Sequence, residues 1–68
     1  MGENIKISYE AARVNANLTQ IQAAEKLHVS RTTLQNWEQG KTEPKASNIK
    51  DMEEVYGIPA AFLFFYKR

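Results

Sequence analysis

The chain has 68 residues, a formal net charge of +1 and no cysteine. A chain of this length forms one small domain with a thin core, here residues 1–68, with 1–5 expected to be flexible and 65–68 to form a tail. The lack of cysteine excludes disulfides and thiolate zinc sites, and His28 by itself cannot hold a metal ion. The near-neutral charge also excludes binding of nucleic acid by net charge alone, so any such binding must depend on local charges and base-edge contacts.

Other functional classes are also disfavoured. No apolar run approaches the roughly 20 residues of a membrane-spanning helix, and the polar first residues do not resemble a signal peptide, so we expect a cytoplasmic protein without membrane contact. No Ser/His/Asp or Cys/His set and no glycine-rich phosphate loop is present. We therefore expect neither enzyme activity nor a cofactor.

Short helical segments separated by turn signals follow one another, without the alternation typical of strands. Ser8, Thr19 and Ser30 are good N-cap residues, and Gly40 and Gly57 are good helix-ending residues. The predicted helices span residues 9–15, 20–27, 31–39, about 47–56 and 60–64. The expected fold is all-α, a compact bundle of five helices.

The apolar positions of these helices predict the core. In the first helix they are Ala11, Ala12 and Val14. Ala23 and Ala24 are small enough to let another helix approach closely, and the stripe of the fourth helix ends at Tyr56. The predicted core comprises Ala24, Leu27, Val29, Leu34, Trp37, Ile49, Met52, Val55, Ile58, Phe62 and Leu63.

The segment from Thr19 to Gly40 predicts a helix-turn-helix, because two short helices are joined by only three residues. On the second helix, Leu34 and Trp37 point to one side. The opposite arc carries side chains able to pair with base edges and no acid or aliphatic residue, namely Arg31, Thr32, Gln35, Asn36 and Gln39. We interpret this arc as a base-reading face, while an ordinary solvated surface remains the alternative.

From Leu18 to Leu63, about two thirds of the chain, the sequence resembles the phage repressor and Cro (Xre-like) DNA-binding domains. The matching residues are Leu18-Thr19-Gln20, Ala23-Ala24, Leu27-His28-Val29-Ser30, Leu34, Trp37-Glu38, Gly40, Lys41, Pro44 and Tyr56-Gly57-Ile58. The resemblance implies a lambda-repressor-like bundle with a central helix-turn-helix, in which Arg31, Thr32, Gln35 and Asn36 read bases in the major groove of double-stranded DNA. It implies phosphate contacts at Gln20, Ser30, Thr33, Gln39, Gly40, Lys41, Thr42 and Lys45, in which the loop at 40–42 offers both backbone and side-chain donors.

The resemblance also implies a structural ion pair between Arg13 and Glu38, which would hold the reading helix against the first helix; an ordinary exposed pair is the alternative. Three residues depart from the pattern. His28 stands where relatives have glycine and is expected to adopt a positive φ at some cost. Ile21 stands where relatives carry an acid or amide, and Glu43 places a negative charge in the loop that would approach DNA.

The aromatic end of the chain, Phe62 to Tyr66, exceeds what one short helix can bury, and such patches tend to mark interfaces. We expect a homodimer through the C-terminal helix and this tail, assembled in solution or mainly on DNA, on a palindromic operator. A tail folded back over its own core is the alternative. The expected function is transcriptional regulation as a phage or mobile-element repressor or Cro-like regulator, and the alternative is an antitoxin or adaptor module. The sequence leaves open whether the chain is a truncated domain.

Overall fold

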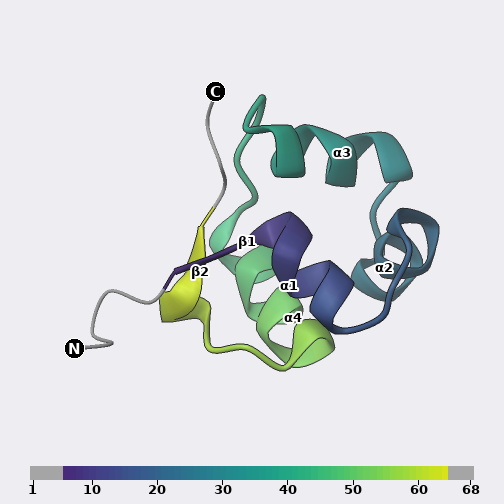
Figure 1. Ribbon diagram of the computed structural model, residues 1–68. Helices are drawn as coiled ribbons and strands as arrows, with labels where there is room; N and C mark the ends of the chain where they lie inside the picture. The colour runs from purple at the N-terminus through teal and green to yellow at the C-terminus, as the bar shows by residue number, and fades with distance from the viewer. Residues whose placement is uncertain (1–5, 65–68) are drawn as a thin grey trace.

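A computed structural model describes residues 6–64 of the chain, and Figure 1 shows its arrangement. The expectations of a flexible segment at 1–5 and a tail at 65–68 lie outside the described residues. The elements, in chain order, are β1 (Ile7–Ser8), α1 (Tyr9–Asn15), α2 (Gln20–Leu27), α3 (Arg31–Gln39), α4 (Ala46–Tyr56), the 3₁₀ turn η1 (Ala60–Phe62) and β2 (Leu63–Phe64). The bounds of α1, α2 and α3 match the predicted helices, and α4 begins one residue before the predicted start at Ser47.

Local hydrogen bonds explain where the helices begin. The Ser8 Oγ accepts from the Ala11 amide at 3.0 Å. At the start of α2 the Thr19 Oγ1 accepts from the Gln22 amide at 3.1 Å, and the Gln22 Oε1 accepts from the Thr19 amide at 2.9 Å. This reciprocal pair is a capping box, and it satisfies backbone donors that the first helical turn leaves unpaired.

No helix in residues 6–64 is long and apolar enough to cross a membrane.

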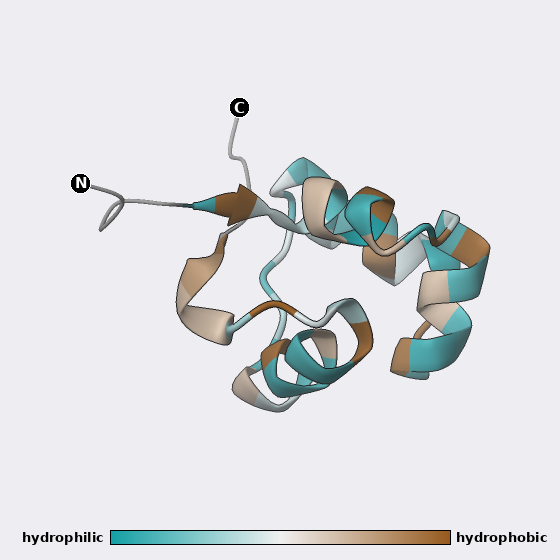
Figure 2. Ribbon diagram, turned by 60° about the horizontal axis from the view of Figure 1, so that its bottom comes forward, coloured by the Kyte–Doolittle hydropathy of each residue, from teal (hydrophilic) through white to brown (hydrophobic). Residues whose placement is uncertain are grey.

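The core lies where α1 and α4 pack against the other elements, and α2 contacts both α3 and α4. Its buried residues are Tyr9, Ala12, Ala23, Ala24, Leu27, Leu34, Trp37, Met52, Tyr56 and Leu63. Val29, Ile49, Val55 and Ile58, also expected in the core, are half-buried and pack against this cluster. Figure 2 shows helices that carry both hydrophilic and hydrophobic residues, as one buried face for each helix requires.

Of the predicted inner face of α1, Ala12 is confirmed, whereas Ala11 and Val14 are wrong. The helix buries Tyr9, Ala12 and Arg13, whereas Ala11 is exposed and Val14 is 56% exposed. The apolar residues alone indicated a partly wrong side of α1 as buried. Arg13 points inward because it forms an ion pair, which a pattern of hydrophobic residues does not reveal.

The predicted fifth helix, residues 60–64, is present only as a three-residue 3₁₀ turn, so the five-helix count is not confirmed. The described residues form four α-helices, the 3₁₀ turn η1 and a two-residue parallel strand pair in which Ile7 lies opposite Leu63 and Ser8 opposite Phe64. The side-by-side strands β1 and β2 are visible in Figure 1. A helix of five residues would make few internal hydrogen bonds, whereas pairing with β1 satisfies the backbone of this segment in an extended conformation.

Phe62 is not part of the core, contrary to expectation, since it is 40% exposed. It belongs to η1, while Leu63 is already extended at φ −87° and ψ 141° and is buried. The change of backbone conformation between the two residues sends their side chains in different directions. Only one of these neighbours can therefore reach the core.

Candidate nucleic-acid interface

Helix α3 has one buried face and one polar face. Leu34 and Trp37 are buried in the core. On the other side Arg31, Thr32 and Gln39 are exposed, while Gln35 and Asn36 are half-buried. The structure therefore brings all the predicted base-reading residues onto the outward side of one helix.

The turn between α2 and α3 sets how closely the two helices approach. His28 has φ 60° and ψ 41°, the left-handed conformation expected from the sequence, and it ends α2. The Val29 amide then donates to the Ala24 carbonyl at 3.0 Å, and the small side chains of Ala23 and Ala24 are buried. Small buried side chains allow neighbouring elements to pack closely against α2, which contacts both α3 and α4.

Ser30 caps α3, since its Oγ accepts from the Thr33 amide at 3.0 Å and donates to the Thr33 Oγ1 at 2.9 Å. Two of the predicted phosphate-binding hydroxyls, those of Ser30 and Thr33, are thus engaged with each other in the protein without DNA. A hydroxyl hydrogen can rotate, so a phosphate can compete for the Ser30 hydrogen, and it can also accept the Thr33 hydrogen, which this contact does not use.

An ion pair joins α1 to the end of α3. The Arg13 Nε donates to the Glu38 Oε2 at 2.7 Å, and the Arg13 Nη2 donates to the Glu38 Oε1 at 3.3 Å. The Arg13 Nη1 also donates to the Leu18 carbonyl at 2.9 Å. The two side chains are 9% and 4% exposed, so this is a buried bidentate pair rather than the exposed pair that was the alternative. Removing one partner would leave the other charge buried and uncompensated.

Gln20, the first residue of α2, connects this pair to the polar face of α3. Its Nε2 donates to the Glu38 Oε1 at 3.2 Å, and its Oε1 accepts from the Arg31 Nε and from the Gln35 Nε2, each at 3.3 Å. The contact with Gln20 explains why Gln35 is half-buried. Sequence reasoning assigned Gln20 to phosphate and missed this bridge, because helix spacing does not reveal which residues of two helices meet.

The loop after α3 differs from the expectation that its backbone supplies donors. The Gly40 amide donates to the Trp37 carbonyl at 3.2 Å, and the Lys41 amide donates to the Asn36 carbonyl at 2.9 Å. The Thr42 amide also points to the Asn36 carbonyl, at 3.4 Å. These three amides therefore complete the end of α3, and the donors that remain available at Lys41 and Thr42 belong to their side chains.

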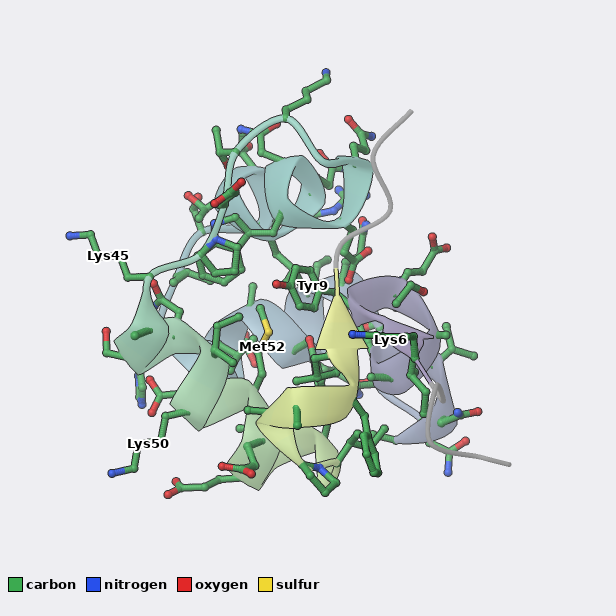
Figure 3. The ribbon with its side chains drawn as sticks, turned by 90° about the vertical axis from the view of Figure 1, so that its left-hand side faces the viewer. Lys6, Tyr9, Lys45, Lys50 and Met52 are labelled. Atoms are coloured by element: carbon green, nitrogen blue, oxygen red, sulfur yellow. The ribbon has the colours of Figure 1, made fainter. Side chains whose placement is uncertain are left out.

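The loop between α3 and α4 has exposed side chains at Lys41, Thr42 and Lys45. Lys45 precedes α4, and its amide donates to the Asn48 Oδ1 at 3.0 Å. In Figure 3 the side chain of Lys45 extends away from the body of the domain. Glu43 is exposed in the same loop, so the loop carries both signs of charge.

Two tyrosines, Tyr9 and Tyr56, are buried in the core near charged residues of this site. Burial raises the pKa of Tyr56 to about 12, with the nearby Glu38 carboxylate adding to the rise and Arg13 opposing it. The Tyr56 hydroxyl has no hydrogen-bond partner among the described residues. Burial, and secondarily Glu43, raises the pKa of Tyr9, which belongs to the same buried cluster as Met52; both are labelled in Figure 3.

Other kinds of site are scarce. The described residues contain no group of three or more His, Cys, Asp or Glu side chains able to hold a metal ion. A shallow open depression is lined by Glu10, Arg13, Thr19, Gln20, Ile21 and Arg31. Ile21 is 56% exposed at this depression, as its position in the sequence suggested. The depression adjoins the polar face of α3 through Gln20 and Arg31.

Comparison with known proteins identifies the class. A helix-turn-helix family model matches residues 10–63, and the chain therefore belongs to the helix-turn-helix family, of the Xre/Cro-like type that its sequence resembles. Among individual proteins, the chain is similar to the HTH-type transcriptional activator BcrR of Enterococcus faecalis, with 41% identity over 46 residues, which is 68% of this chain and 22% of that protein. The chain thus spans about a fifth of the length of this relative. No solved structure gives a significant match.

Proposed function

We propose that this protein binds double-stranded DNA at specific sequences and thereby regulates transcription. One observation carries the proposal: α3 is anchored by Leu34 and Trp37 while Arg31 and Thr32 are exposed on its other side. Arginine, amide and threonine side chains are those that recognise base edges in the major groove. Membership of the helix-turn-helix family supports the same function.

In this proposal the base-reading residues are Arg31, Thr32, Gln35 and Asn36. The phosphate contacts come from the side chains of Gln20, Ser30, Thr33, Gln39, Lys41, Thr42 and Lys45. Gly40, also predicted to contact phosphate, is left out of this set, because it has no side chain and its amide donates to the Trp37 carbonyl. Phosphate contacts fix the orientation of the protein on the duplex, whereas base contacts select the sequence. Each set can be tested separately.

Selection of bound sequences from random DNA would give the operator and its half-site spacing. On that operator we expect Arg31→Ala to weaken binding by roughly 1–3 kcal/mol and to relax preference at one base position. Lys41→Ala should weaken binding to all sequences about equally and reduce its salt dependence. Lys26→Ala, at an exposed α2 residue, is the control. No binding to any DNA at low salt would overturn the proposal and favour the antitoxin or adaptor alternative.

We also propose a homodimer on a palindromic operator, with the region around Phe62 at the interface. Phe62 is an exposed aromatic next to the β1–β2 pair, and exposed apolar surface tends to mark interfaces. The C-terminal helix expected to form this interface is replaced by η1 and β2, so the contact would involve a turn and a strand edge. Sedimentation of the protein alone and with operator DNA tests this, and one protein per operator at high concentration would contradict it.

The direction of regulation is a further part of the proposal. We propose a repressor or Cro-like regulator of a phage or mobile element, whereas the relative from Enterococcus faecalis is named an activator. A reporter placed behind the selected operator separates the two. Expression that falls when the protein is supplied supports repression, and expression that rises overturns it.

A further inference from the structure

One acidic side chain in the shallow depression beside α3 has no partner. The residues that line this depression are Glu10, Arg13, Thr19, Gln20, Ile21 and Arg31. Arg13 is paired with the buried Glu38 carboxylate. Glu10 is exposed, and no residue within 6–64 forms a hydrogen bond or an ion pair with its carboxylate. Its negative charge can therefore act on any charged molecule that approaches the depression.

The depression adjoins the side of the domain proposed to bind DNA. Gln20 and Arg31 both line it, and the Arg31 Nε donates to the Gln20 Oε1 at 3.3 Å. In the proposed function Gln20 contacts a phosphate and Arg31 enters the major groove, so the sugar-phosphate backbone runs beside the depression. Interactions between exposed charges extend over about 10 Å at 0.1 M salt. We therefore expect the Glu10 carboxylate to lie within range of the phosphates.

A carboxylate at this place opposes the binding of DNA, because each phosphate carries a negative charge. Glu10 also lies in the first turn of α1, where a negative charge interacts favourably with the helix dipole. The same side chain thus stabilises the fold and repels the DNA backbone. Its substitution should change stability and affinity in opposite directions, which separates the two roles.

We propose that Glu10 faces the DNA backbone and lowers the sequence-independent part of the affinity, so that stable binding depends on the base contacts of α3. The inference rests on the proposed DNA binding, and it adds a repulsive contact from α1 to that interface. Sequence-independent affinity comes from the neutralisation of phosphates by cations. Because a genome offers a large excess of sites without the operator sequence, weak attraction to phosphates limits how much of the protein they retain.

The test compares Glu10→Gln and Glu10→Lys with the matched controls Glu54→Gln and Glu54→Lys. Glu54 is an exposed glutamate in the last turn of α4, and Figure 1 shows that end of α4 on the side of the domain away from α3. Each variant is titrated with the selected operator and with a duplex that lacks it, at several salt concentrations.

We expect Glu10→Gln to raise the affinity about threefold and Glu10→Lys about tenfold on both duplexes at low salt, with gains that shrink as salt rises. The Glu54 variants should change either affinity by less than about twofold, because their charge lies beyond the screening distance. A gain of affinity cannot come from a damaged fold. Thermal unfolding should show both Glu10 variants to be slightly less stable than the original.

Two results would overturn the inference. One is the absence of any gain with both Glu10 variants, and the other is a gain on the operator alone, since Glu10 would then act on base recognition through Arg31. A double variant adds a further check: Glu10→Lys should restore the affinity that Lys41→Ala removes, on both duplexes, because the two positions act independently. Wild-type protein that binds no DNA would contradict the proposed function instead, so the two failures are distinguishable.

Discussion

The helix-turn-helix segment and the two ends of the described chain are held by different kinds of contact. Between Thr19 and Gly40, each helix boundary has a local device: Thr19 and Ser30 cap helices, and His28 and Gly40 end them in left-handed conformations. At the ends, β1 and β2 are joined by pairing between residues from opposite ends of the described chain. Neither strand has a reason to be extended without the other.

The difference shows where precision is needed. The polar face of α3 is supported by local caps, by the buried Arg13–Glu38 pair and by Gln20, so its side chains are placed from several directions. Each strand of the β1–β2 pair has only two residues, and the pair contributes Leu63 to the core. Substitutions in the two regions test how much each kind of contact contributes to stability.

Trp37→Ala should have the largest effect. Trp37 is buried between α3 and the rest of the core, and its truncation should cost about 3–5 kcal/mol, a large part of the stability of a small domain. Circular dichroism should show a mostly unfolded chain at room temperature. Gln39→Ala, at an exposed position of the same helix, should change the free energy of unfolding by less than about 0.5 kcal/mol. A well-folded Trp37→Ala variant would contradict the anchoring of α3.

High pH should destabilise the folded protein through Tyr56, which is buried close to the Arg13–Glu38 pair. Tyr56 has a pKa of about 12 in the folded protein against 10.0 in its ordinary state. Between these values the unfolded chain has lost the phenol proton and the folded chain keeps it, so the free energy of unfolding falls as pH rises, by about 2–3 kcal/mol at most.

Tyr56→Phe is the matched control for this pH effect, measured by denaturant unfolding at several pH values. It removes both the titrating group and an unpartnered buried hydroxyl, so it should be as stable as the original at neutral pH or more stable. It should lose less stability at high pH. Identical alkaline curves for the two proteins would show that Tyr56 does not carry the effect.

Leu63→Ala measures how much the strand pair contributes. Leu63 is at the edge of the buried cluster, and we expect a loss of about 2 kcal/mol, less than for Trp37. Phe62→Ala, at the exposed neighbouring position, should stay within about 0.5 kcal/mol of the original. If the two variants were equally stable in thermal unfolding, the chain end would contribute nothing to the core.

His28→Gly should have the smallest effect, and it should stabilise. His28 has φ 60°, which costs a non-glycine residue about 1 kcal/mol, and part of this gain is offset by the greater freedom of glycine in the unfolded chain. The expected increase in the free energy of unfolding is thus below about 1 kcal/mol. His28→Ala keeps the unfavourable conformation and should not show the gain. An alanine variant as stable as the glycine variant would place the strain elsewhere.

Much of the candidate site was predictable from sequence because its causes are local. Caps and helix-ending residues define α2 and α3, and the spacing of Leu34 and Trp37 defines which side of α3 faces outward. The resemblance to Xre-like domains added the Arg13–Glu38 pair. Apolar periodicity could not predict this pair, because it does not expect a charged residue on the buried side of α1. The bridge at Gln20 and the occupied amides after Gly40 were not predictable, because they depend on which atoms of separate elements meet.

By itself, the sequence determined the helices from Tyr9 to Tyr56, the left-handed turn at His28 and the arrangement of polar and apolar residues on α3. Each of these follows from interactions among residues close together in the chain. Only the tertiary structure decided that Leu63 and Phe64 pair as a strand with Ile7 and Ser8, that Phe62 is exposed, and that Gln20 joins Glu38 to Arg31. Those contacts join residues distant in sequence, so their stability exists only once the helices have packed.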